Sequence, residues 1–147
     1  MEHYLMLRIA HAAAAGILAL GLVIHGAALM YALWRCPGGV EKTVRLARRF
    51  SLPLLALLGV SLPVTGWWLT HWAEIPLGQF WLLTSILLLP LFVPFGLLLA
   101  GNLKRWQLHL ASKQAVGVKQ KVFALLWWLA LLALVVAINA LMGIKPL

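Results

Sequence analysis

The sequence predicts an all-α fold, an antiparallel bundle of four transmembrane helices with both termini on the outer, periplasmic side. Of the 147 residues, 64% are hydrophobic and only 10% are charged, whereas soluble domains carry about 25% charged residues. Four apolar stretches each reach the length of about 20 residues that a spanning helix needs. The short alternating pattern of a membrane barrel is absent. We therefore expect a single membrane domain over residues 1–147.

The first two spans are expected over residues 4–33 and 50–70. The first is too long for the apolar region of a secretory signal, and it lacks a basic start and a clear cleavage site. It is rich in Ala and Gly, which let helix backbones approach closely, so we place it centrally in the bundle. Its one charge, Arg8, can reach the interface. Pro63 is expected to bend the second span.

The third and fourth spans are expected over residues 79–101 and 122–143. Pro90 and Pro94 should bend the third span and free some of its backbone carbonyls. The residues that follow it, about 103–121, are expected to continue as an interfacial helix.

Ten of the twelve Lys and Arg residues lie in two segments between the spans. The segments are 34–49 and 102–121, which we expect to be cytoplasmic loops. Because basic residues favour the cytoplasmic side, the termini and residues 71–78 are predicted to lie outside a bacterial inner membrane. The expected partners of the basic loops are anionic lipid head groups. Nucleic acid is not expected, since these residues flank apolar spans.

The eight tryptophans fit this orientation, because Trp favours the head-group level. Four are expected at the outer interface and four toward the inner one. The outer set is Trp67, Trp68, Trp72 and Trp81, and the inner set is Trp34, Trp106, Trp127 and Trp128.

His11 and His71 are the main candidate metal-binding residues. Both are predicted in the outer half, on antiparallel helices, where two neutral imidazoles can hold a b-type haem between them. A copper ion would accept the same imidazoles. The simpler alternatives are an interfacial, solvated His71 and a His11 that is hydrogen-bonded to a neighbouring helix. Further polar residues are predicted at this depth: Gln79, Thr84, Ser85 and Asn139.

His25 follows His11 by fourteen residues on the same predicted helix. This spacing returns the side chain to within about 40° of the same face, about 21 Å further along. Two stacked cofactor sites would have this pattern. No histidine from another span matches the depth of His25, however, and its nearest recognisable neighbours are Trp127 and Trp128. A packed, hydrogen-bonded His25 is therefore the alternative to a second site.

The sequence contains no Asp, and Glu2, Glu41 and Glu74 lie outside the apolar spans. A hydrolase or a carboxylate-driven proton pump is therefore disfavoured. Nucleotide-binding glycine motifs are also absent. Any enzymatic role would depend on a bound cofactor, which would make the chain a haem-dependent membrane oxidoreductase.

Residues 48–106 resemble the CopD-type module of bacterial inner-membrane proteins and the related HemJ-type protoporphyrinogen oxidases. The matching stretches are "RRFSLPLLALLGVSLPVTGWWL", "PLGQFWLLTS" and "AGNLKRW", together with "LRIAHAAAAGILALG" in the first span. The resemblance implies a four-helix membrane bundle that handles haem, porphyrin or copper, with His11 as a ligand. The family often has a lysine where this chain reads Leu83-Thr84-Ser85, so simple haem or metal binding is implied rather than porphyrinogen oxidation.

Three hypotheses for function follow. The first is a protein that binds haem b through outer-side histidines and serves in electron transfer or haem handling. The second is copper handling or transport at the same residues. The third is a cofactor-free accessory subunit, whose partners would be the other subunits of a membrane complex or further copies of this chain.

Overall fold

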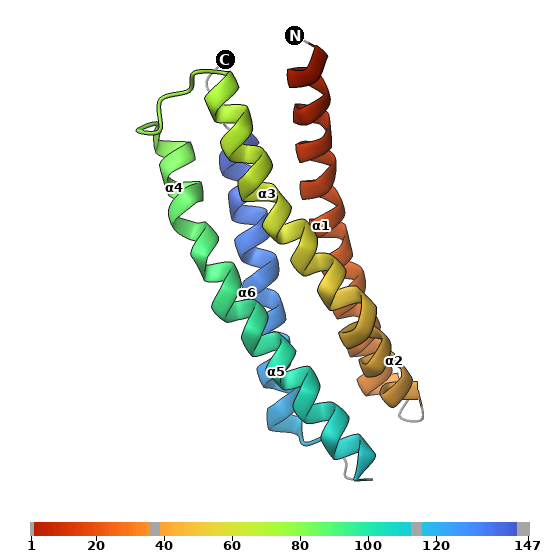
Figure 1. Cartoon of the computed structure of the whole chain (residues 1–147). Coiled ribbons are helices and arrows are strands. Elements are labelled where there is room, and N and C mark those ends of the chain that lie inside the picture. The colour runs from red at the N-terminus through yellow and green to blue at the C-terminus, as the bar shows by residue number, and fades with distance from the viewer. Residues whose placement is uncertain (1, 36–38, 113–115, 144–147) are drawn as a thin grey trace.

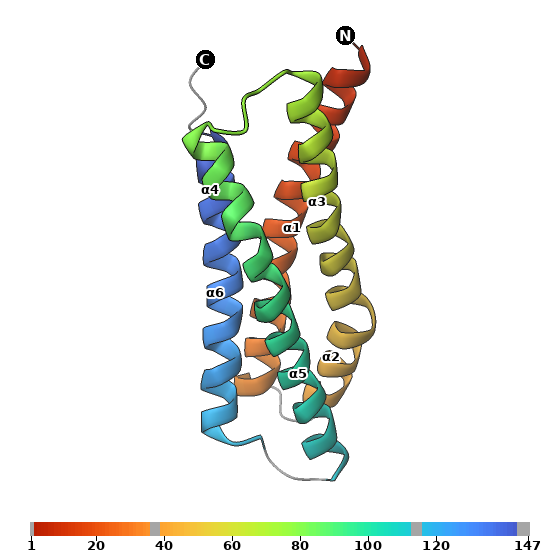
Figure 2. The ribbon, with the colours of Figure 1, turned by 60° about the vertical axis from the view of Figure 1, so that its left-hand side comes forward.

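The computed structural model describes residues 2–35, 39–112 and 116–143. Its described part is helical without a strand, and four segments are long and apolar enough to cross a membrane. These segments are Glu2–Trp34, Val40–Trp72, Phe80–Ala111 and Val118–Gly143. They run side by side as an antiparallel bundle (Figures 1 and 2). The predicted all-α fold class is therefore confirmed.

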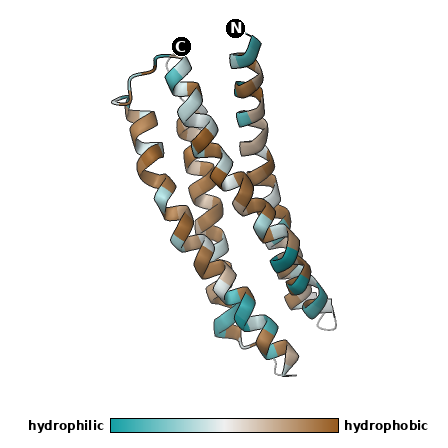
Figure 3. Ribbon diagram, in the orientation of Figure 1, coloured by the Kyte–Doolittle hydropathy of each residue, from teal (hydrophilic) through white to brown (hydrophobic). Residues whose placement is uncertain are grey.

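The bundle has two chemically different ends. The first, which we call the terminal end, contains the start of α1, the end of α6 and the connection 73–79. The second, the basic end, contains α2, the last turns of α5 and the start of α6 (Figure 1). Hydrophilic residues gather at the basic end and at the start of α1, while the middle of the bundle is apolar (Figure 3). This distribution is what a lipid-spanning bundle requires.

Helix α1 (Glu2–Arg35) contacts both α3 and α6. In the most apolar part of the first span, 33% of the residues are buried within the chain. The corresponding fraction in the second span is 6%. The first span is therefore the most enclosed helix, as its small residues predicted. Gly21 and Gly26 carry this packing, because a Cβ at either position would lie within 3 Å of a side chain from a neighbouring helix.

The second span begins earlier than expected, because much of the predicted loop 34–49 is helical. Helix α2 (Val40–Leu46) leads through a π-helical turn, η2 (Ala47–Ser51), into α3 (Leu52–Trp72) without a break. Val40 and Val44 are buried, so α2 is amphipathic and its charged residues face outward. Hydropathy alone missed this helix because its charges lower the average. Residues 36–38 of the predicted loop lie outside the described residues.

The third span is divided at its first proline. Helix α4 (Phe80–Leu88) ends in a 3₁₀ turn, η3 (Leu89–Leu91), and α5 (Phe92–Ala111) follows. Pro90 lies in the 3₁₀ turn, where it cannot donate a backbone hydrogen bond, whereas Pro94 lies within α5. Helix α5 continues ten residues past the predicted boundary at residue 101, in line with the expected continuation, of which 113–115 lie outside the described residues.

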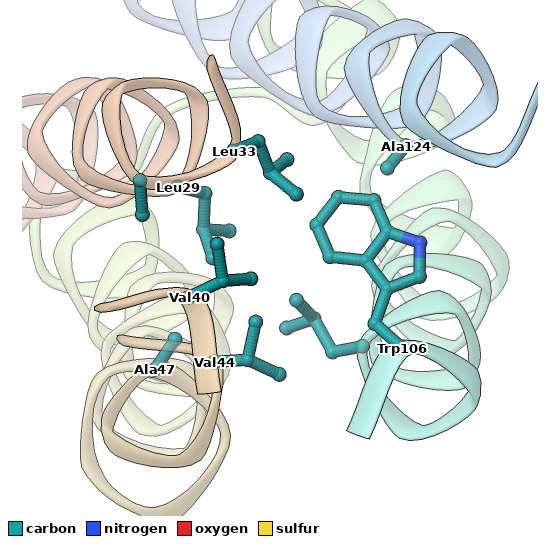
Figure 4. Packing of buried hydrophobic residues seen from close by; sticks show 9 residues of the cluster. Leu29, Leu33, Val40, Val44, Ala47, Trp106 and Ala124 are labelled. Atoms are coloured by element: carbon teal, nitrogen blue, oxygen red, sulfur yellow. The ribbon is translucent and has the colours of Figure 1, made fainter. Parts of the chain in front are cut away.

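The basic end is held together by a hydrophobic cluster around Trp106. This side chain is fully buried, at 0% exposure, and it was predicted at the membrane interface rather than inside the protein. Its neighbours come from α1, α2 and α6 (Val118–Gly143) as well as α5, and they surround the indole ring from several sides (Figure 4). The cluster consists of Leu29, Ala32, Leu33, Val40, Val44, Ala47, Leu103, Trp106 and Ala124. The extra helical turns of α2 and α5 therefore add residues from the predicted loops to a core that also includes the end of the first span and the start of the fourth.

Helix α3 ends in a Schellman motif with an unusual residue in its left-handed position. The N–H of Ile75 donates to the carbonyl of Thr70 at 3.0 Å, and that of Glu74 donates to the carbonyl of His71 at 3.3 Å. The residue directly after the C-cap adopts the left-handed conformation in this motif and is usually Gly. Here it is Glu74, with φ of 51°. A side chain in this conformation costs about 1 kcal/mol or more relative to Gly.

We expect Glu74→Gly to raise the free energy of unfolding by about 1 kcal/mol. The reason is that Gly adopts the left-handed conformation without the steric cost of a Cβ. Thermal unfolding followed by the helical circular dichroism signal measures the change. Glu41→Gly is the matched control, since Glu41 lies in the first turn of α2, where Gly lowers stability by about the same amount. A loss of stability in Glu74→Gly would contradict the prediction.

Candidate cofactor-binding histidines of α1

The imidazole of His11 is hydrogen-bonded to a side chain of α3 near the terminal end. Its Nδ1 lies 2.7 Å from the hydroxyl oxygen of Thr65. That hydroxyl has one proton and lies 2.8 Å from the carbonyl oxygen of Ser61, to which it donates. While that hydroxyl donates to Ser61, the hydrogen between His11 and Thr65 belongs to Nδ1. In that tautomer Nε2 is the nitrogen with which a neutral imidazole binds a metal.

His25 makes the same kind of contact near the basic end, in a more enclosed place. Its Nδ1 lies 2.7 Å from the hydroxyl oxygen of Ser51, and the residue is only 4% exposed. Its Nε2 is buried and has no hydrogen-bond partner among the residues that the structure describes. A buried polar atom without a partner is costly, and unpaired polar groups at membrane depth commonly have a function.

The two contacts share one register between antiparallel helices. His11 and His25 are fourteen residues apart on α1, and Ser51 and Thr65 are fourteen residues apart on the second span. The prediction that both histidines lie on one face of the first helix is therefore confirmed. Their separation along the helix is about 21 Å, which is most of a hydrocarbon layer about 30 Å thick.

The hydroxyl partner of His25 is placed by the π-helical turn. Ser51 is the last residue of η2, the only π-helical turn in the described ranges. Such turns are rare and often occur at functional sites. A π-turn inserts about one extra residue per turn, so it changes which side chains α2 and α3 direct toward α1. Local geometry in the second span is thus adjusted where it meets His25.

Trp128 of α6 packs against Gly26, the residue that follows His25 on α1. Its indole N–H donates to the carbonyl oxygen of Leu22 at 2.7 Å. A Cβ on Gly26 would lie 1.9 Å from the indole Cε2 atom, so the absence of a side chain at Gly26 lets the ring approach α1. The sequence predicted Trp128 at the depth of His25, and the structure places the two helices in contact there.

His71 is not brought together with His11. It is exposed at the end of α3 and lines a surface pocket with Trp67 and Glu74. Relative to Thr65, which contacts His11, it lies six residues on, about 240° around the helix and about 9 Å along it. The His11 and His71 imidazoles therefore lie on different sides of α3, about 120° apart, and the predicted pairing of His11 with His71 is not present in this arrangement.

The other polar residues predicted at the outer depth do not converge on one site. Thr84 and Ser85 donate to carbonyls one turn earlier in α4, and the Asn139 amide donates to Val135 in α6. The Gln79 side chain accepts the indole N–H of Trp81. Each group is thus satisfied close to its own position in the chain. Across residues 2–35, 39–112 and 116–143, no group of three or more His, Cys, Asp or Glu side chains could hold a metal ion.

Ser51 and Thr65 are the site residues that the sequence analysis missed. The available signal was their spacing, which equals that of the two histidines on the preceding helix. In an antiparallel helix pair, equal spacing places both members of each pair at the same depth.

A family model described as "Predicted integral membrane protein (DUF2269)" matches residues 5–146. No curated protein matches the chain, and no solved structure does. The family match supports a multi-pass membrane protein, and it gives no support to the CopD-type or HemJ-type resemblance.

Proposed function

The chain belongs to the DUF2269 family of predicted integral membrane proteins, and from this premise we propose that it binds haem b through the histidines of α1. The observation that carries the proposal is the repeated contact of an imidazole Nδ1 with a hydroxyl of the second span, Thr65 in α3 and Ser51 in η2. Histidines that bind metals almost always hold their other ring nitrogen in such a hydrogen bond. Buried His25, whose Nε2 has no partner among the described residues, is the strongest instance.

Haem suits these residues better than a protein-bound copper ion. The porphyrin brings its own four nitrogen ligands, so that one imidazole suffices as an axial ligand. A copper site needs several protein side chains around one ion. The copper hypothesis is therefore retained as an outcome that metal analysis would reveal, with His11 as its first candidate ligand.

The different membrane depths of His11 and His25 favour electron transfer across the membrane. Haem bound there would take up and release single electrons. The two imidazoles lie about 21 Å apart along α1, one toward each surface of the bilayer. Under the positive-inside rule, the basic end faces the cytoplasm of a bacterial cell and His11 lies toward the outer surface. We propose Thr65 and Ser51 as positioning residues that fix the tautomer and orientation of each ring.

The absorption spectrum of protein purified after haem-sufficient expression tests the proposal. We expect a Soret band in both redox states and an α-band on reduction. His11→Ala and His25→Ala should each lose about half of the bound haem, because each removes one axial ligand. Ser51→Ala and Thr65→Val should weaken haem binding about 10–100-fold and shift the reduction potential of the affected haem.

His3→Ala is the matched control, since His3 is exposed at the start of α1 and its substitution should leave the spectrum unchanged. Thermal unfolding of each variant separates loss of haem from loss of the fold. The absence of a Soret band in either redox state would overturn the proposal. So would a wild-type spectrum in both the His11 and the His25 variants.

An accessory role in a larger complex is favoured by one observation. Only 6% of the most apolar part of the second span is buried within the chain, which leaves much of α3 to be covered by lipid or by another subunit. A chain without a chromophore that purifies with a stoichiometric partner would select this role.

A further inference from the structure

The terminal end carries a pocket that the proposed haem sites do not use. It has a volume of about 350 Å³, at the small end of the range of about 300–1,000 Å³ typical of ligand pockets. Its walls come from the last two turns of α3 and from the connection to α4. The lining residues are Trp67, Thr70, His71, Glu74, Ile75 and Leu77.

This pocket opens away from the interior of the bundle. Relative to Thr65, which contacts α1, Trp67, Thr70 and His71 lie about 140–240° around α3. A ligand therefore reaches the pocket from the lipid side at the end of the span, where Trp residues favour the head-group level. An amphiphile that resides in the bilayer would reach the pocket by this route.

The lining selects a neutral ligand with hydroxyl groups. It contains no Lys or Arg, and the carboxylate of Glu74 would repel a phosphate or another anion. Glu74 and His71 both accept hydrogen bonds. The Thr70 hydroxyl donates to the carbonyl of Trp67 and can accept as well. These groups suit hydroxyl donors, while Trp67, Ile75 and Leu77 offer apolar contacts to a ring.

We propose that this pocket binds the head group of a membrane-soluble hydroquinone, which donates electrons to the haems. The identification as an electron donor rests on the proposed haem function, whereas the binding itself does not. Oxidation of one hydroquinone to the quinone releases two protons and two electrons. The protons pass to the imidazole of His71 and the carboxylate of Glu74, and then to water at the terminal end. Haem held by His11 and His25 would accept the two electrons, one at each site.

A quaternary ammonium amphiphile is the competing ligand, because an aromatic face and a carboxylate also suit a cation. Such a cation has no N–H or O–H group, so it would leave the imidazole and the Thr70 hydroxyl unused. The pocket also contains a single aromatic ring rather than the several that surround such cations. The hydroquinone therefore accounts for more of the lining.

Calorimetric titration of the purified full-length protein in micelles with a decyl-substituted benzohydroquinone tests the binding. Protein-free micelles provide the blank, and the haem content of each sample is measured from its spectrum. We expect one class of saturable site. Glu74→Gly should weaken binding at least tenfold, because the acceptor for a ligand hydroxyl is lost, while its thermal midpoint rises. A folding defect cannot explain a loss of binding in a variant that is more stable.

The oxidised quinone gives a second, sharper readout. It lacks hydroxyl donors, so Glu74→Gly should change its affinity less than twofold. Trp67→Ala should weaken both redox forms, whereas Trp72→Phe, which does not line the pocket, should leave both unchanged. Equal hydroquinone affinity in the wild type and Glu74→Gly would overturn the proposal, as would heats no greater than those of the blank. Equally strong displacement by decyltrimethylammonium would replace it with a cation site.

The two proposals fail in different ways. Saturable hydroquinone binding by a protein without a Soret band would overturn the haem proposal and leave the binding site intact, although not its role as an electron-donor site. A haem spectrum with no hydroquinone binding would overturn the inference alone.

Discussion

Substitution of Gly26 by Ala is expected to destabilise the bundle by about 2–4 kcal/mol, as the sum of overpacking and a lost hydrogen bond. The added Cβ would lie 1.9 Å from the indole Cε2 of Trp128, a separation that no contact tolerates. The ring must move, and its N–H then leaves the carbonyl of Leu22. Helix α6 is thereby pushed away from α1 beside His25.

The free energy of unfolding, from titration with a denaturing detergent, measures this effect. Gly16→Ala is the matched control on the same helix, because a Cβ there meets nothing within 4 Å. Its stability should stay the same or rise by up to about 1 kcal/mol. The double variant Gly26→Ala/Trp128→Leu should be more stable than additivity predicts, since the smaller side chain removes the clash. A Gly26→Ala protein as stable as the Gly16 variant would disprove the close approach.

Substitution of Trp106 by Ala is expected to cost about 3–5 kcal/mol, the range found when a packed Trp or Phe is truncated. The side chain is fully buried, in a cluster to which α1, α2 and α6 contribute as well as its own helix α5 (Figure 4). Its removal leaves a cavity that the surrounding helices fill only in part. The same unfolding titration measures the loss.

Trp106→Phe separates packing from hydrogen bonding. The indole N–H of Trp106 has no partner within the described part of the chain, so loss of that group carries no hydrogen-bond penalty. We therefore expect a cost of about 1 kcal/mol, much less than for Ala. Trp72→Ala, at a residue that is 48% exposed, should change stability by less than about 1 kcal/mol. Equal losses in Trp106→Ala and Trp72→Ala would show that Trp106 is an interfacial residue after all.

Hydropathy predicted the four spans because lipid imposes a single requirement on each of them. It assigned α2 and the last ten residues of α5 to the loops between spans, because these helices carry charges on one face and a core on the other, and only the amphipathic pattern of residues 103–121 indicated a helix there. Their apolar faces are short, as in Val40 and Val44. A window average mixes the two faces and therefore assigns such segments to loops. Trp106 was misplaced because the apolar face of the expected interfacial helix was assigned to the membrane, whereas it lies in a core cluster.

The sequence predicted the membrane depth of the candidate histidines, but not how α3 is rotated about its own axis relative to them. The spacing of His11 and His25 established that they share one face, and the structure agrees. Which residues oppose that face depends on how α3 is turned about its axis, which no hydropathy pattern reports. His71 was therefore paired with His11 by depth alone, whereas the second span turns Thr65 toward α1 and His71 away from it.

The matched pairs His11–Thr65 and His25–Ser51 also have a mechanical consequence. Two bonds so far apart fasten the first span to the second at two points. A slide of α1 by one turn, about 5.4 Å, or a rotation about its axis would break both bonds together. The two contacts therefore hold the first span against both sliding and rotation relative to the second.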